Sequence, residues 1–145
     1  MIVRRMQDAI GTERDVRTPA WRSVRLLLAD DGMGFSFHVT TIDAGETLEM
    51  QYTNHLESVY CIEGTGTIED LDEGVHHAIE PGVVYALDRH DRHRLRATER
   101  LVLACVFNPP LRGQEVHDAS GSYPAADAFQ TAAAPAGAVA GEQRP

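Results

Sequence analysis

The chain has 145 residues and a formal net charge of −9, from 13 basic and 22 acidic side chains, and every basic residue other than histidine is arginine. The lack of lysine excludes the functions that need an ε-amine: a Schiff base with a substrate carbonyl, a pyridoxal-phosphate anchor and a phosphate-loop lysine. The length fits one domain, and an acidic chain repels phosphate backbones and anionic lipid, so we expect a small-molecule partner and neither nucleic acid nor a membrane.

The N-terminal segment, MIVRRMQDAIGTERDVR, carries an arginine pair but not the apolar stretch of a secretory signal. Nowhere in the chain do about 18 apolar residues run together, the length that a membrane-spanning helix needs. We therefore expect a cytoplasmic protein. Helix is expected only as short pieces near the N-terminus, one of them capped by Thr18 with Pro19 at its first position.

From residue 22 onward, apolar and polar residues alternate in short runs, as in half-buried strands, and turn-forming Gly, Pro, Asp and Asn separate the runs. Many short strands at a spacing of about 8–12 residues predict an antiparallel all-β sandwich or barrel. The expected strands are Arg22–Leu28, Phe35–Ile42, Thr47–Tyr52, Ser58–Glu63, Gly66–Asp70, Val75–Ile79, Val83–Leu87, His93–Ala97 and Leu101–Asn108.

Both cysteines, Cys61 and Cys105, lie in apolar strand-like runs, far apart and without the spacing of a metal knuckle. A free cysteine packs like a small hydrophobe, so we expect both to be reduced and buried. From residue 125 to 145, Ala, Gly and Pro dominate, and only Phe129 and Val139 offer bulk to a core. The prediction is one domain over residues 1–124, followed by a disordered tail over residues 125–145.

Two stretches of the strand region have the spacing of the cupin motifs. The first, Gly45-x5-Gln51-x-Thr53-x3-Glu57-x6-Gly64, fits G-x5-H-x-H-x3,4-E-x6-G with Gln and Thr in place of the two histidines. The second, Gly82-x5-Asp88-x-His90-x2-His93, follows G-x5-P-x-G-x2-H-x3-N but lacks its proline, inner glycine and terminal asparagine. The two motifs favour a cupin barrel, a double-stranded β-helix of the jelly-roll type, and retain one metal ligand each, Glu57 and His93.

Two protein ligands rarely hold a first-row metal firmly, so we expect a third from an inward-facing neighbour. Tyr85 is the candidate, because it lies on the strand between the second-motif glycine and His93. A nearby dication would lower the pKa of its phenol enough to make it a hard anionic ligand. Carboxylate, phenolate and imidazole together suit Fe(2+) or another first-row dication. The alternative is that Tyr85 fills the barrel and Glu57 caps a turn.

Four longer stretches resemble the ectoine synthase family: DDGMGFSFHVTTI (30–42), YTNHLESVYCIEG (52–64), PGVVYALDRHDRH (81–93) and VFNPPLRGQEVHDASGSYP (106–124). The resemblance runs from Met1 to about Pro124 and excludes the alanine-rich tail. It implies a small iron-dependent cupin in which Glu57, Tyr85 and His93 bind the iron. It also implies the reaction, in which N-γ-acetyl-L-2,4-diaminobutyrate closes into ectoine with loss of water.

That reaction needs a polarised carbonyl, because amides are poor electrophiles, and a metal with an open position polarises one. The attacking amine must be unprotonated and the departing oxygen must gain protons, which calls for groups that titrate near neutrality. Holding the flexible substrate in a ring-like shape supplies the remaining advantage.

The resemblance implies a set of side chains around the substrate: Trp21, Arg25, Thr40, Tyr52, Phe107, Glu115 and His117. We expect Glu115 and His117, with Tyr52, to act in catalysis, the first two holding the ammonium end of the substrate and moving protons from a loop across the barrel mouth. The alternative is that Glu115 and His117 are solvated surface groups. Arg25 could bind the substrate carboxylate with a bidentate fork, whereas an arginine on a strand is more often exposed.

Other residues near the motifs have weaker indications. Cys105 alternates with Phe107 along one strand and so could face the same cavity, and His55, two residues before Glu57, could support a ligand by a hydrogen bond. We assign no role to His76, His77 and His90.

Exposed barrel strands are readily covered by a two-fold partner, so a homodimer is expected. Two other functions remain open. One is a cupin that only binds a small ligand, as a sensor would. The other is a cupin dioxygenase, disfavoured because the usual motif histidines are absent at positions 51 and 53.

Overall fold

Strands are the main regular secondary structure of the computed structural model, which describes residues 1–125. Short runs of alternating polarity form ten strands, and helix is limited to one turn of α-helix and one of 3-10 helix near the N-terminus. In chain order the elements are α1 (Met6–Ala9), β1 (Asp15–Arg17), β2 (Trp21–Leu27), η1 (Ala29–Asp31), β3 (Ser36–Ile42), β4 (Thr47–Met50), β5 (Leu56–Glu63), β6 (Gly66–Asp70), β7 (Val75–Ile79), β8 (Val84–Leu87), β9 (His93–Ala97) and β10 (Leu101–Asn108).

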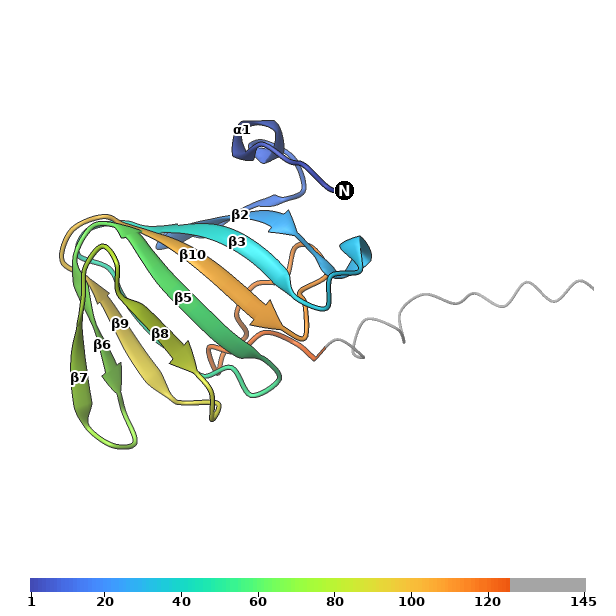
Figure 1. Ribbon diagram of the computed structural model, residues 1–145. Coiled ribbons are helices and arrows are strands. Elements are labelled where there is room, and N and C mark those ends of the chain that lie inside the picture. Colours follow the sequence, from blue (N-terminus) through green and yellow to red (C-terminus); the bar gives the residue numbers. More distant parts are fainter. Residues whose placement is uncertain (126–145) are drawn as a thin grey trace, which may run out of the picture.

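The strands form two antiparallel sheets. One has six strands in the order β1-β2-β3-β10-β5-β8, and the other has four in the order β4-β9-β6-β7. The two sheets diverge from one end, and the segment that follows β10 lies at the wider end, below the six-stranded sheet in the view shown (Figure 1). Some neighbours are consecutive in the chain, such as β2 and β3, whereas others are distant, such as β10 between β3 and β5. The interior of the sandwich therefore gathers residues from most of the described chain.

The core lies between the sheets, and strict alternation along the strands supplies it. On β10 the side chains of Leu101, Leu103, Cys105 and Phe107 are buried, whereas the residues between them are half-buried. The prediction for the cysteines is confirmed, because Cys61 and Cys105 are both free and buried. Burial of this face is the main stabilising contribution to the fold.

The expected helix at Thr18 is wrong. The Thr18 hydroxyl does accept hydrogen bonds from the backbone amides of Ala20 and Trp21, at 3.3 and 3.2 Å, but these close a turn and not a helix. β2 starts at Trp21, because its backbone pairs with β3 from Trp21 opposite Ile42. Tertiary pairing therefore overrides a local capping signal.

Strand β1 was not expected from the sequence. It is only three residues long, and its outer residue Asp15 pairs with the Arg22 guanidinium of β2 at 2.7 Å. The predicted disordered tail lies outside the described residues apart from residue 125. Among residues 1–125, no helix is long and apolar enough to cross a membrane.

Candidate active site

A cavity between the two sheets gathers most of the expected site residues. Seven of the ten line it: Trp21, Thr40, Tyr52, Glu57, Tyr85, Phe107 and His117. Strand register explains the grouping. Phe107 of β10 lies directly opposite Glu57 of β5, and Tyr85 lies opposite Val59, two residues further along β5 and so on the same face.

Aromatic rings form one wall of the cavity around Tyr52. The ring of Tyr52 stacks on that of Tyr123 at 5.4 Å between centroids and 3° between planes, and meets Phe107 edge-on at 5.3 Å. Pairs in these arrangements add specific stabilisation to the area they bury. The wall therefore holds the Tyr52 hydroxyl in one place.

His117 lies between Tyr52 and Trp21. Its Nε2 and the Tyr52 hydroxyl oxygen are hydrogen-bonded at 3.1 Å, and its ring centroid is 5.3 Å from that of Trp21. Burial, with smaller effects from Arg25 and His93, lowers the pKa of His117 to about 4. Burial and the neighbouring Glu57 raise the pKa of Tyr52 well above its usual value. At neutral pH the pair is thus a neutral imidazole beside a protonated phenol, which can accept and donate a proton respectively.

Of the three expected metal ligands, Tyr85 is the one that shares a pocket with each of the other two. Glu57 and Tyr85 line the cavity together, and Tyr85 and His93 together line an adjoining pocket. Among residues 1–125, no group of three His, Cys, Asp or Glu side chains is placed to hold a metal. The expected set contains only two such residues, and its third member is a tyrosine.

His93 has the environment of a metal-binding imidazole. Its Nδ1 is 2.9 Å from the Asp91 carbonyl oxygen, an arrangement in which Nδ1–H donates and the Nε2 lone pair is left free. Nε2 is buried and has no hydrogen-bond partner. A buried nitrogen without a partner is costly, and a metal ion would satisfy it.

The two oxygen donors also fit a cation. Burial raises the pKa of Glu57 to about 8, and burial together with Glu57 raises the pKa of the Tyr85 phenol well above its usual value. Both anionic forms are disfavoured by the protein alone, and a dication between them would reverse that preference. Carboxylate, phenol and imidazole here therefore fit a first-row dication.

Arg25 and Glu115 are not among the residues that line the cavity. The guanidinium of Arg25 is fully buried and bonds the Gly113 carbonyl, the Glu115 carbonyl and, at 3.3 Å, the Glu115 carboxylate. Both side chains thus have partners within the protein, but the buried Nε of Arg25 has none. Their expected contacts with the substrate stay a prediction.

Comparison with known proteins identifies the chain. Residues 1–127 match the family model described as ectoine synthase.

The chain belongs to the ectoine synthase family.

Members of this family are similar to the chain over nearly their whole length. The L-ectoine synthase of Sphingopyxis alaskensis is 61% identical over 125 residues, which cover 86% of this chain and 91% of the relative. The crystal structure of ectoine synthase from P. lautus has a TM-score of 0.75 at 49% identity and covers 77% of this chain and 80% of that one.

A more distant similarity supports the fold alone. The Schizosaccharomyces pombe Cnp3 cupin domain, at 12% identity, has a TM-score of 0.52 and covers 61% of this chain and 64% of that one. The all-β cupin fold and the enzyme class predicted from the sequence are confirmed.

One residue of this ectoine synthase cavity, Tyr123, was not expected from the sequence. Tyr123 lines the cavity, is buried and stacks on Tyr52. The available signal was that no other Phe, Trp or Tyr occurs between the end of β10 and residue 125. Cys105 does face the cavity beside Phe107, as its alternation indicated.

Three histidines have surroundings that spacing did not reveal. His90, to which no role was assigned, has its Nδ1 2.7 Å from the Tyr52 carbonyl and so helps to fix Tyr52. His55 is buried beside Phe107 and Tyr123, at centroid distances of 6.2 and 6.3 Å. His38 is buried against Phe107 at 5.3 Å.

Proposed function

We propose that this chain closes N-γ-acetyl-L-2,4-diaminobutyrate into ectoine. The α-amine attacks the acetamide carbonyl carbon of the same molecule, the carbonyl oxygen leaves as water, and a cyclic amidine remains. Both protons of that water come from the substrate, because the amine nitrogen gives them up as its new bond to carbon becomes the amidine. The L-ectoine synthase names of the relatives and the cavity described above support this assignment.

The observation that carries the proposal is the Tyr52–His117 pair in the cavity. Neutral His117 accepts a proton from the attacking nitrogen at Nε2, and the protonated Tyr52 hydroxyl donates toward the oxygen that develops negative charge. Their 3.1 Å separation lets a proton pass from one site to the other without solvent. The Glu115 carboxylate accepts hydrogen bonds from the Arg112 and Gly113 amides, and the role in proton transfer expected for it stays a prediction.

The apolar walls fold the substrate and exclude water. Trp21 and Phe107 are both almost fully buried and both line the cavity. Their rings restrict the four-carbon chain to shapes in which its amine approaches its own acetamide. Thr40, also in the lining, supplies a hydroxyl for hydrogen bonding to the substrate.

Glu57, Tyr85 and His93 would hold the metal, and Fe(2+) is the ion that we propose. Bound there, it would supply Lewis-acid polarisation of the acetamide carbonyl. The unpartnered Nε2 of His93 and the two buried oxygen donors support this placement.

Incubation of the pure protein with ferrous iron and the acetylated diamino acid tests the activity. Ectoine is expected in the wild type, and His117→Gln should lower kcat by about 100-fold because general acid–base catalysis is lost. His77→Gln, on the exposed face of β7, is the matched control. A folded, iron-loaded wild type that forms no ectoine would contradict the assignment and leave a ligand-binding cupin.

Metal analysis tests the ligand set separately from turnover. Tyr85→Phe should bind at least about 10-fold less iron at equal free metal because one anionic donor is lost. Tyr60→Phe, at an exposed position of β5, should bind the wild-type amount. Equal iron in Tyr85→Phe and the wild type would remove Tyr85 from the site.

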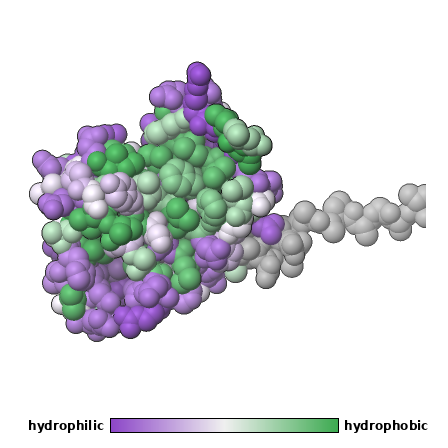
Figure 2. Space-filling view, in the orientation of Figure 1, coloured by the Kyte–Doolittle hydropathy of each residue, from purple (hydrophilic) through white to green (hydrophobic). Residues whose placement is uncertain are grey.

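We also propose that the protein is a homodimer. The outer face of the six-stranded sheet exposes large apolar residues, and a broad hydrophobic area appears over β3, β10 and β5 (Figure 2). Tyr60, Ile62 and Val84 are 49%, 48% and 65% exposed, and Tyr60 lies opposite Val84 across the β5–β8 pairing. An uncharged patch of this kind suits a second copy, because two acidic chains meet there without repulsion.

A further inference from the structure

A second pocket also reaches the proposed metal ligands, and we call it the acidic pocket. It is formed by the end of β6 with the turn that follows, and by β8 with the connection to β9, which lie together at the wider end of the sandwich (Figure 1). Tyr85 and His93 line it, and Tyr85 is the one described residue that it shares with the lining of the substrate cavity. The metal site therefore has an approach other than the substrate cavity.

Carboxylates dominate the charge of the acidic pocket. In the part of the chain that the structure describes, four carboxylates and one guanidinium line it: Asp70, Glu73, Asp88, Asp91 and Arg89. The guanidinium is shared, with a terminal amino group 3.3 Å from Glu73 and Nε 4.0 and 3.9 Å from Asp88 and Asp91. One positive charge thus lies among several negative ones, and the excess of negative charge attracts cations.

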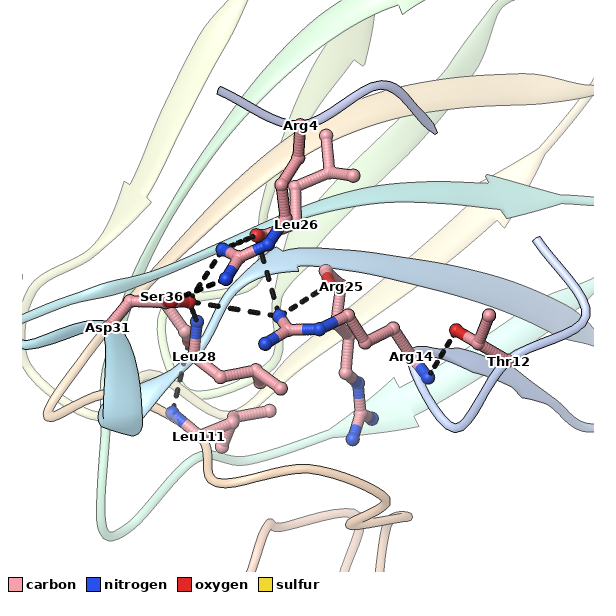
Figure 3. A network of polar contacts seen from close by, with 9 residues as sticks. All are labelled: Arg4, Thr12, Arg14, Arg25, Leu26, Leu28, Asp31, Ser36 and Leu111. Atoms are coloured by element: carbon pink, nitrogen blue, oxygen red, sulfur yellow. Dashed lines mark hydrogen bonds and ion pairs between the residues drawn. The ribbon is translucent and has the colours of Figure 1, made fainter. Parts of the chain in front are cut away.

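The charged network around Asp31 has the opposite balance (Figure 3). Arg4 and Arg14 both pair with the Asp31 carboxylate, which also accepts a hydrogen bond from the Leu28 amide at 2.9 Å. Guanidinium groups outnumber carboxylates there, so the network repels cations and serves to tie the N-terminal segment to η1. A surplus of carboxylates is therefore a particular property of the acidic pocket and not a general result of the acidic composition.

The carboxylates of the acidic pocket form a path from solvent inward. The side chains of Asp88 and Glu73 are 77% and 58% exposed, whereas that of Asp91 is 16% exposed. Asp70 is half-buried and lies directly opposite the buried His93 across the β6–β9 pairing. A cation attracted at the mouth thus meets further carboxylates on its way to the imidazole.

The inner end of this path is a nitrogen without a partner. The Asp91 carbonyl accepts from Nδ1 of His93 at 2.9 Å, and the buried Nε2 of the same ring has no hydrogen-bond partner. Burial lowers the pKa of His93, whereas the charges of Asp91 and Asp70 act in the opposite direction. Both carboxylates are thus near enough to favour positive charge at the ring, and a dication gains about twice as much from them as a proton does.

The substrate cavity is a poorer route for an ion. Glu57 is the only carboxylate among its described lining residues, and most of the others are apolar or aromatic. A dication that moves along apolar walls loses its hydration without replacement, which is costly. Carboxylates replace part of that hydration, so the acidic pocket offers the lower barrier.

We propose that the acidic pocket is the entrance by which a hydrated divalent cation reaches Glu57, Tyr85 and His93, separate from the cavity that takes the substrate. The inference rests on the metal site proposed above and adds how that site is filled. Among residues 1–125, no three His, Cys, Asp or Glu side chains are placed to hold a metal, so the pocket attracts the ion without retaining it. Its outer carboxylates therefore set the rate of loading, and not the amount of metal bound at saturation.

Iron uptake by the metal-free, full-length protein tests the entrance. The protein is mixed with ferrous iron at low ionic strength without oxygen, and bound iron is measured at successive times. The double variant Glu73→Gln/Asp88→Asn should slow uptake about 10-fold, because attraction at the mouth is lost. Arg89→Gln removes the opposing charge and should speed uptake at least about twofold. All three side chains are exposed, so the fold and the iron bound at saturation should match the wild type.

Asp43→Asn/Glu80→Gln is the matched control, because it removes two exposed carboxylates that do not line the acidic pocket. It should load at the wild-type rate, and salt at about 0.5 M should bring all the rates together. Equal rates at low ionic strength, or equal slowing in the control, would overturn the entrance and leave the metal site intact. A wild type that binds no iron would overturn both.

Discussion

At the scale of single residues, burial decides the charge state of His117. Its pKa of about 4 lies well below the ordinary value of histidine, and the first cause is loss of water around the ring. His38 and His55 are shifted in the same direction by burial. The folded protein therefore keeps these imidazoles neutral where an unfolded chain would protonate them.

The pH dependence of stability follows from that difference. Below its ordinary pKa of about 6.5, His117 is protonated in the unfolded chain, whereas in the folded chain it stays neutral down to about pH 4. Stability therefore falls as the pH falls from about 6.5 to about 4, and His117 does not affect it at higher pH. Between about pH 7.5 and about pH 5, the free energy of unfolding should therefore fall by about 1–2 kcal/mol less in His117→Gln than in the wild type. Urea unfolding with chelator in every sample measures this, and equal losses would contradict it.

The two thiols should be inert in the folded protein. Burial raises the pKa of both Cys61 and Cys105, and the thiolate is the reactive form. Ellman's reagent should therefore label neither thiol at neutral pH in the native protein and both after unfolding in denaturant. Rapid labelling of one thiol in the folded state would show that its strand opens locally.

At the scale of elements, one motif glycine has a steric role that another lacks. Gly64, between β5 and β6, has φ +88°, and a Cβ there would lie 2.0 Å from the Arg100 carbonyl oxygen. Gly82, before β8, has φ +97°, but a Cβ there would meet nothing within 4 Å. The tight turn at Gly64 is therefore closed against the β9–β10 connection.

Alanine scanning separates the two effects. Gly82→Ala should lower the free energy of unfolding by about 1 kcal/mol, because only the positive φ disfavours a side chain there. Gly64→Ala should cost about 3 kcal/mol or more, because backbone atoms must also move. Thermal unfolding of the two variants checks the order, and similar melting temperatures would show that the β9–β10 connection yields easily.

Much of the strand structure was predictable because alternation is local. The expected and observed bounds agree for β6, β7, β9 and β10, where one face is clearly apolar or a turn residue ends the run. Thr18 and β1 were misjudged because the pairing of β2 with its neighbours, and not local preference, decides the conformation there.

The site was predictable in part for the same reason. Trp21, Phe107 and Tyr85 lie on strands, where register fixes the direction of the side chain. The Arg25–Glu115 contact joins residues 90 positions apart and depends on the path of an irregular loop, which no periodic pattern describes.

At the scale of the whole molecule, the outer face of the six-stranded sheet is the proposed dimer interface. The wild type should have twice the mass of the 15.9 kDa chain in solution. Val84→Asp places a charge at a position that is 65% exposed, so the fold should persist while the dimer dissociates. Light scattering after size exclusion measures the mass, with His77→Asp on β7 as control. A wild type of single-chain mass would refute the dimer.

Strand β5 serves both sides of its sheet. Glu57, Val59 and Cys61 are buried toward the interior, while Leu56, Tyr60 and Ile62 are exposed on the other side. A shift of one residue would exchange the two sets. An insertion or deletion within β5 would therefore damage the cavity and the outer surface together, whereas β7, with four exposed residues of five, is free to diverge. During evolution the two halves of the sandwich should thus accumulate changes in length at unequal rates.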